Sequence, residues 1–252
     1  MKVIYINYSD TNFRRNQEML VHHVRVNNIF DGVIPYTREW LLTKNFYIEN
    51  KKILDKQRLG GYCIWKPYII LTAFESIQEG DVVVYMDCGD IPSTKLRKNV
   101  YDHMIRHDQY LLQQYPHNKN KHFTKRDCFY YMNCDEEKYW DTVQLEGGFM
   151  AWKRTERNVQ ILSEYLKYCT DERIVTDIPN QSGLDNFDGY VSHRHDQSII
   201  TNLQVKYNLS KVDGWLDNTG AGAFIKWNAL YHKDGVEYSN GSRNWDENGV
   251  LK

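Results

Sequence analysis

Two aspartates that follow an apolar segment are the residues of this sequence best suited to chemistry. Asp87 and Asp90 come directly after Val82-Val83-Val84-Tyr85-Met86, with Gly89 between them. Close carboxylates repel each other, so both keep their charge only where a cation neutralises them. Oxygen ligands of this kind suit Mg²⁺ or Mn²⁺, and such an ion brings phosphate ligands with it. The pair predicts a divalent metal site; the alternative is a turn whose aspartates cap a helix.

Three further segments combine glycines or helix-opening residues with groups that could bind a ligand. Lys66 follows the glycine pair Gly60-Gly61, where a bound phosphate would find both space and a cation. Glu146 precedes a second glycine pair, and glycines inside a strand often mark the close approach of a ligand. Asp196 and Gln197 open a predicted helix, whose N-terminus favours anions. The structural alternatives are a solvated loop around Lys66, a β-bulge after Glu146 and a helix cap at Asp196.

The elements that must position these groups alternate between strand and helix. Short β-branched or aromatic runs predict strands at 3–8, 33–36, 82–86, 109–113 and 143–152. Apolar residues at helical spacing predict helices at 13–28, 65–78, 95–107, 159–169 and 196–207. This alternation predicts a single α/β domain over residues 1–252, with a mainly parallel sheet and helices on both faces. Ligands on such sheets bind outside the carboxyl ends of the strands, where Asp87 is placed.

Composition excludes several classes of function. The 252 residues carry 32 Lys+Arg and 33 Asp+Glu, for a formal charge of −1, so the chain is not a general nucleic-acid binder. Apolar runs fall far short of the ~20 residues that span a bilayer, and no cleavable signal opens the chain. The five scattered cysteines form no C-x-x-C pair, so we expect a reduced, cytoplasmic setting.

Taken together and in order, these segments resemble GT-A glycosyltransferases. The resemblance is nearest to small bacterial and viral enzymes that assemble polysaccharide, lipopolysaccharide and capsule, and it covers roughly residues 1–235. The matching stretches are Gly61-Tyr-Cys-Ile-Trp65-Lys66-Pro67, Tyr85-Met-Asp87-Cys-Gly89-Asp90, Glu146-Gly-Gly-Phe-Met150 and His193-Arg-His-Asp196-Gln197. The chain departs from the family in two places: the second carboxylate of the D-x-D motif falls one residue late, and Glu146 replaces the Asn of an N-x-G motif.

The resemblance implies a single GT-A (Rossmann-like) domain that moves a hexosyl or pentosyl group from a nucleoside diphosphate sugar, most simply a UDP-sugar, to a glycan hydroxyl. Residues 1–115 would bind the donor and residues 116–252 would face the acceptor. The implied donor-binding residues are Tyr8, Ser9, Asp10, Lys66 and Asp87. Mn²⁺ or Mg²⁺ would be held by Asp87, Asp90 and His232. The implied catalytic residues near the sugar are Asp196, Gln197 and Glu146.

Two other functions fit parts of the sequence. A non-catalytic carbohydrate-binding module would explain the 14% aromatic content, because Tyr and Trp rings stack on sugars. A phosphatase with Asp87 as its nucleophile would explain the strand-end aspartate, but the later Lys and acidic pair of such enzymes are absent at the required spacing. Nucleotide affinity separates the first alternative from a transferase, and a covalent phospho-enzyme would identify the second.

Overall fold

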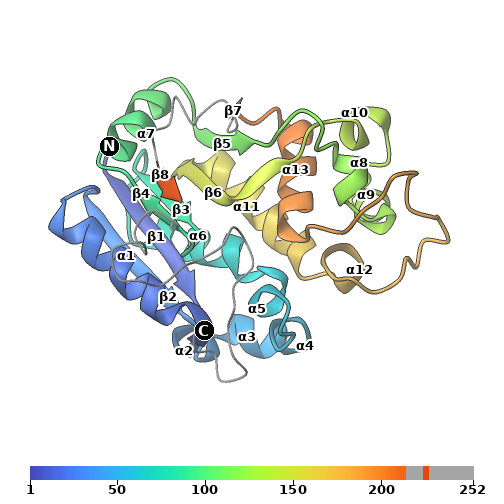
Figure 1. Ribbon diagram of the computed structural model, residues 1–252, viewed down its shortest axis with the longest axis horizontal. Coiled ribbons are helices and arrows are strands. Elements are labelled where there is room, and N and C mark those ends of the chain that lie inside the picture. The colour runs from blue at the N-terminus through green and yellow to red at the C-terminus, as the bar shows by residue number, and fades with distance from the viewer. Residues whose placement is uncertain (214–223, 227–252) are drawn as a thin grey trace.

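The computed structural model describes residues 1–213 and 224–226, and its centre is a six-stranded sheet in the order β2-β1-β3-β6-β5-β7 (Figure 1). β6 runs antiparallel to both of its neighbours, and the other paired strands are parallel. The prediction of a mainly parallel α/β sheet is therefore confirmed. The strands are β1 (Val3–Ser9), β2 (Gly32–Thr37), β3 (Val82–Met86), β5 (Gln109–Gln113), β6 (Leu145–Lys153) and β7 (Lys211–Asp213).

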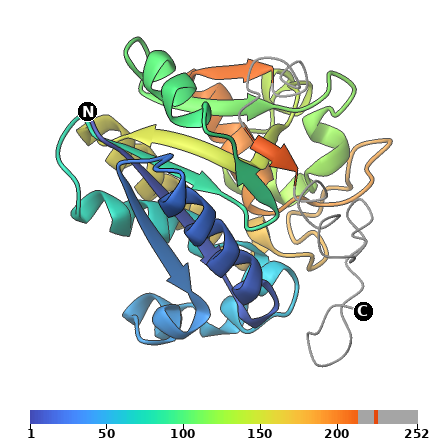
Figure 2. The same ribbon diagram turned by 60° about the vertical axis from the view of Figure 1, so that its left-hand side comes forward.

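Alternate residues of β1 separate two apolar layers, because successive side chains of a strand point to opposite faces. Val3 and Tyr5 pack with residues of α1 and α7 on one face, where Figure 2 shows α1 lying against the sheet. Ile4 and Ile6 pack with residues of α6, α11 and α13 on the other face. The helices are η1 (Thr11–Phe13), α1 (Arg14–Val26), α2 (Arg38–Leu42), α3 (Asn45–Glu49), α4 (Lys51–Leu54), α5 (Leu59–Tyr62), α6 (Trp65–Glu75), α7 (Leu96–Met104), α8 (Asn120–Phe123), α9 (Arg126–Tyr131), α10 (Glu137–Trp140), α11 (Glu156–Cys169), α12 (Glu172–Val175) and α13 (Asp196–Tyr207).

Four further observations complete the description of the fold. A short antiparallel pair joins β4 (Asp90–Pro92) to β8 (Phe224–Lys226), so Asp90 opens a strand. The helices α2 to α5 gather beside the carboxyl ends of β1 and β2 (Figure 1). All five cysteines are free thiols. No helix in the described part of the chain has the length and apolarity to cross a bilayer.

One edge of the sheet collects the segments that the sequence singled out. The carboxyl ends of β1, β3 and β5 lie at the same edge as the start of β6, because β6 alone is reversed. The Asp87 N–H donates to the Gly148 carbonyl at 2.9 Å, and the Gln114 N–H donates to the Gln144 carbonyl at 2.8 Å. The fold thus brings residues near 10, 87, 114 and 147 to one edge.

Candidate active site

Asp87 and Asp90 converge above a glycine. A Cβ atom added to Gly148 would lie 3.3 Å from Oδ2 of Asp87 and 3.6 Å from Oδ2 of Asp90. The two carboxylates therefore approach one point over the bare side of Gly148, which any larger residue would fill. The Tyr85 hydroxyl donates a hydrogen bond to Oδ1 of Asp87 and fixes that carboxylate. Two convergent carboxylates beside an open space are ligands that suit a hard divalent cation.

Only part of the predicted metal site lies within the described residues. His232, the third predicted ligand, lies outside the described residues. Within residues 1–213 and 224–226, no group of three His, Cys, Asp or Glu side chains is placed to hold a metal. Mg²⁺ in proteins often takes only one or two carboxylates and completes its shell with water and substrate phosphate. The Asp87–Asp90 pair fits an ion of that kind.

Lys66 and Asp196 form a buried ion pair beneath the strand that carries the glycines. Lys66 Nζ lies 2.7 Å from Oδ2 of Asp196 and donates to the Gly147 carbonyl at 2.8 Å. Burial alone would lower the pKa of Lys66, but Asp196 and other nearby anionic groups raise it above its usual value. Burial raises the pKa of Asp196, and Lys66 opposes that change. Lys66 is therefore held inside the fold by Asp196 and the Gly147 carbonyl, and Asp196 balances its charge.

Gln197 holds the first glycine of the strand directly, and Asp196 acts on that glycine only through Lys66. The Gly147 N–H donates to Oε1 of Gln197 at 3.0 Å, and Nε2 of Gln197 donates to Gln144. A Cβ on Gly147 would lie 3.1 Å from Oε1 of Gln197, so a larger residue there would require the Gln197 side chain to shift. The pairing of β5 with β6 also changes register here, which confirms the β-bulge alternative without removing the ligand interpretation.

Glu146 differs from the other two predicted catalytic residues because it is exposed. Its Oε2 accepts a hydrogen bond from Nε2 of Gln114 at 3.0 Å. Only one residue, Gly147, separates it from Gly148, so the two Cα atoms are at most about 7 Å apart. Of the three, Glu146 is the side chain that a ligand at the edge can reach.

The end of β1 presents buried polar atoms without partners. The Tyr8 ring stacks on Trp65 with centroids 3.9 Å apart, and neither Tyr8 Oη nor Trp65 Nε1 has a well-formed hydrogen bond among the described residues. The Arg38 guanidinium lies close enough to Tyr8 to oppose the rise in its pKa that burial causes. A Cβ on Gly60 would lie 3.7 Å from both Trp65 Nε1 and Oδ2 of Asp10. Buried polar atoms are normally paired, so these two indicate a place for a ligand or water. Ser9, by contrast, donates its hydroxyl to Gln17 inside the fold.

The residues before Lys66 form a left-handed turn that the sequence did not predict. The five residues from Leu59 to Cys63 all have positive φ, between 52° and 90°. Non-glycine residues in this region carry a cost, and such strain gathers at functional sites. A Cβ on Gly61 would lie 2.6 Å from the Leu54 Cα, so glycine is required there. In the sequence, only the glycine pair indicated an unusual backbone conformation here. The other three residues of the turn have types that do not predict positive φ.

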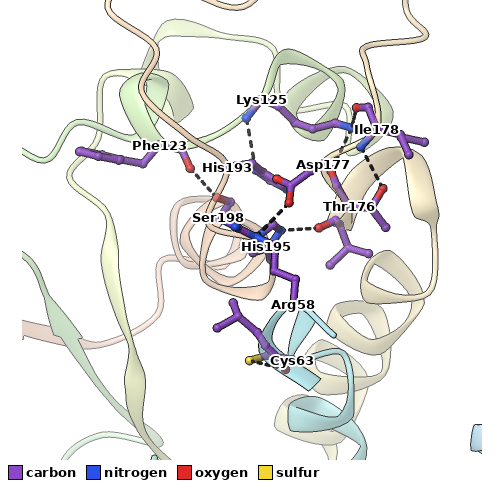
Figure 3. Close-up of polar contacts among 12 residues, drawn as sticks. Arg58, Cys63, Phe123, Lys125, Thr176, Asp177, Ile178, His193, His195 and Ser198 are labelled. Atoms are coloured by element: carbon purple, nitrogen blue, oxygen red, sulfur yellow. Dashed lines mark hydrogen bonds and ion pairs between the residues drawn. The ribbon is translucent and has the colours of Figure 1, made fainter. Parts of the chain in front are cut away.

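Arg58 ties this turn to the segment that opens α13 (Figure 3). Its Nε donates to Nε2 of His195 at 2.9 Å and lies 2.9 Å from Oδ2 of Asp177. The other ring nitrogen of His195 bonds to the Val175 carbonyl at 2.8 Å. His195 itself has φ 53° and ψ −119°, a conformation rarely taken outside glycine. The side chain is thus held at both nitrogens directly before Asp196.

Comparisons with known proteins give distant structural likenesses. No family model matches the chain, and no curated protein matches it. A glycosyltransferase involved in glycosylation of the major capsid of PBCV-1 is 11% identical, with TM-score 0.40 over 77% of this chain and 82% of its own. Mouse xyloside xylosyltransferase 1 is 11% identical, with TM-score 0.45 over 87% and 78%. The glycosyltransferase GlyE of Streptococcus pneumoniae TIGR4 is 13% identical, with TM-score 0.43 over 100% and 58%. These likenesses are too distant to assign a function to the chain.

Proposed function

We propose that this chain is a glycosyltransferase that moves a sugar from a nucleoside diphosphate sugar to a glycan hydroxyl, with a UDP-sugar as the first donor to test. The observation that carries the proposal is the convergence of Asp87 and Asp90 above Gly148 at the carboxyl edge of the sheet. This is where α/β sheets bind nucleotides, and paired carboxylates there suit a metal–diphosphate.

The unpartnered atoms at the end of β1 support the placement of the nucleoside. Tyr8 Oη, Trp65 Nε1 and the Asp10 carboxylate lie one strand away from Asp87, and neighbouring strands are about 4.8 Å apart. A nucleoside held there would direct its diphosphate towards Asp87 and Asp90. The donor sugar would then lie towards β6 and Glu146.

Each group of the edge has a defined part in the transfer. Asp87 and Asp90, with His232 as the third predicted ligand, would hold Mn²⁺ or Mg²⁺, which supplies positive charge for a departing diphosphate. The oxygen of the acceptor hydroxyl bonds to the anomeric carbon while the bond from that carbon to the diphosphate breaks. Glu146 accepts the proton that this hydroxyl loses. Asp196 and Gln197 hold Gly147 in place beneath this reaction.

The test is donor binding by the wild type and by Asp87→Asn, with Asp102→Asn as a matched control on an exposed helix. A panel of nucleotide sugars, each with and without Mn²⁺, is scored by thermal stabilisation. A donor at 100 times its Kd adds about 2.7 kcal/mol to the free energy of unfolding. We expect Mn²⁺-dependent stabilisation and sugar transfer in the wild type and in Asp102→Asn, and their loss in Asp87→Asn.

Other outcomes separate the alternatives. Stabilisation by glycans without any nucleotide effect would favour a carbohydrate-binding module. A phosphorylated Asp87 after incubation with a phosphate ester would favour the phosphatase. An Asp87→Asn variant that still binds donor in a Mn²⁺-dependent way would contradict the metal assignment.

A further inference from the structure

Gln114 is a side chain at this edge that the sequence did not single out. It follows the last residue of β5, and its amide is engaged on both sides. Nε2 donates to Glu146 at 3.0 Å, while Oε1 accepts from Nη1 of Arg194 and from Nδ2 of Asn118. One amide thus fixes both a carboxylate and a guanidinium at the edge of the sheet.

Arg194 is half-buried and pre-positioned. Its guanidinium lies over the Phe123 ring at 3.8 Å from the centroid, and the backbone N–H of Arg194 donates to the Phe123 carbonyl at 3.0 Å. Within the described residues, only Nη1 of this guanidinium has a hydrogen-bond acceptor, namely Gln114. The Nε and Nη2 donors are therefore available to a ligand. The Phe123 ring and Gln114 fix the direction in which they point.

The order of the strands places this group opposite the predicted nucleoside. The sequence of neighbours β1-β3-β6-β5 runs from Tyr8 and Asp10, through Asp87, to Glu146 and then Gln114. Adjacent strands are about 4.8 Å apart, so Gln114 lies roughly 10 Å beyond the strand of Asp87. In a transfer that inverts the anomeric carbon, the attacking molecule approaches from the side away from the leaving diphosphate, which is the side of Gln114.

The chemistry of the group selects the kind of molecule. A carboxylate and the free donors of a guanidinium together offer an acceptor and paired donors, which suit adjacent hydroxyl groups. Glu146 and Arg194 cancel in charge, so the group does not favour an anion. Tyr115, the next residue, is half-exposed and stacks on His117, and exposed aromatic rings beside polar groups suit a sugar face.

We infer that Glu146 and Arg194 form the acceptor subsite of the proposed glycosyltransferase, that this subsite takes a neutral sugar with adjacent hydroxyl groups, and that Gln114 is its positioning residue. The inference rests on the proposed function only in treating the bound sugar as the acceptor of the transfer. Binding of a neutral sugar at this place does not depend on that function and is measured separately.

The direct test is sugar binding by saturation-transfer NMR. The probes are methyl β-D-glucopyranoside, methyl β-D-galactopyranoside and the charged methyl β-D-glucuronide. The variants are Gln114→Met and Arg194→Lys, with Gln160→Met, on the exposed face of α11, as the matched control. We expect the wild type and Gln160→Met to bind at least one neutral glycoside more tightly than the glucuronide. Both site variants should bind it at least about tenfold more weakly, as for the loss of one directed charge-assisted bond.

The kinetic test uses the donor identified by thermal stabilisation and the best neutral glycoside. Gln114→Met should raise the acceptor KM at least about tenfold and lower kcat, while the donor KM changes less than about twofold. A rise in both KM values would indicate a merely structural role. Equal or tighter binding of the glucuronide, unchanged binding in both variants, or no wild-type binding of either neutral glycoside would overturn the inference. Sugar binding without any nucleotide effect would instead contradict the proposed function alone.

Discussion

His193 and His195 are buried in neutral form, and each uses one ring nitrogen as a hydrogen-bond acceptor. Nδ1 of His193 accepts from the Lys125 N–H at 3.3 Å, and its Nε2 bonds to the Ile174 carbonyl. Nε2 of His195 accepts from Arg58. These partners assign the tautomers, and the rings meet edge to face with centroids 5.1 Å apart. A second proton on either ring would replace an accepted bond with a repulsive contact.

We predict that stability falls in mild acid because of these rings. Burial is the main cause that lowers the pKa of both histidines, and Lys125 and Arg58 lower each pKa further. The Ile174 carbonyl opposes this change at His193, and the Val175 carbonyl and Asp177 oppose it at His195, but the pKa of each ring stays below its usual value. The unfolded chain takes up these protons near pH 6.5, while the folded chain takes them up only at lower pH. Below pH 6.5 the unfolded state therefore holds more protons, and each unit of pH costs about 1.4 kcal/mol per ring until the folded pKa is reached.

Urea unfolding at pH 7.5, 6.5 and 5.5 measures this dependence. The free energy of unfolding should be nearly constant above pH 6.5 and should fall towards pH 5.5. His195→Gln should flatten the slope, whereas His22→Gln, at an exposed position of α1, should leave it unchanged. A slope that is the same in all three proteins would assign the acid sensitivity to other groups.

The sequence identified which residues could do chemistry at the site but not what surrounds each of them. Asp196 and Lys66 read as groups that face a ligand, yet both are buried because Gly147 and Tyr165 close over them. These contacts join residues far apart in the chain, and no local pattern reports them. Asp87 was placed correctly at a strand end because five consecutive apolar residues precede it.

The left-handed turn from Leu59 to Cys63 is the least expected element of the fold. Leu59 has φ 52° and leaves half of its surface exposed, so its conformation costs energy while its side chain contributes little burial. The turn is nonetheless held, because Arg58 bonds to His195 and Gly61 packs on Leu54. The turn places Gly60 beside both Trp65 and Asp10.

We predict that Leu59→Gly stabilises the protein. Glycine adopts positive φ without the clash that costs other residues roughly 1–2 kcal/mol. Part of that gain is lost to the greater freedom of glycine in the unfolded chain, so the net increase should be about 1 kcal/mol or less. Leu42→Gly is the matched control, because Leu42 is similarly exposed but ends α2 in helical conformation, where glycine relieves no strain and only adds freedom to the unfolded chain.

Urea midpoints of the two variants, compared with the wild type, decide the matter. Opposite shifts are expected, upward for Leu59→Gly and downward for Leu42→Gly. Equal downward shifts would mean that the turn is not strained at Leu59.

Elements with long periodic patterns were predicted well, and short ones were not. The helix over 196–207 and the strand over 82–86 have the bounds that their apolar patterns predict. The helices between 38 and 62 are one turn or little more; Thr37 indicated the start of α2, which it caps, but α3 to α5 were not predicted from the sequence. Such short helices have almost no stability of their own, so tertiary contacts decide where they form.

The order of groups along the sheet edge is a property of the whole molecule. The chain order is Asp10, Asp87, Gln114, Glu146, but the order in space places Glu146 between Asp87 and Gln114. That exchange occurs because β6 inserts antiparallel between β3 and β5. A pattern of strands and helices predicts the class of sheet but does not contain this insertion, so the sequence could not give the neighbours of the Asp pair.

The edge order predicts where ligands slow backbone hydrogen exchange. UDP with Mn²⁺ should slow exchange at 8–13, 58–66, 87–91 and 145–149, because the proposed nucleotide covers β1, β3 and the start of β6. Adding methyl β-D-glucopyranoside should extend the slowing to 114–118 and 193–197. Residues 105–109 and 207–211 lie at the opposite ends of β5 and β7 and serve as the internal control. Slowing at 105–109 in place of 87–91 would put the nucleotide at the wrong edge and remove the physical basis for the Asp87–Asp90 metal site.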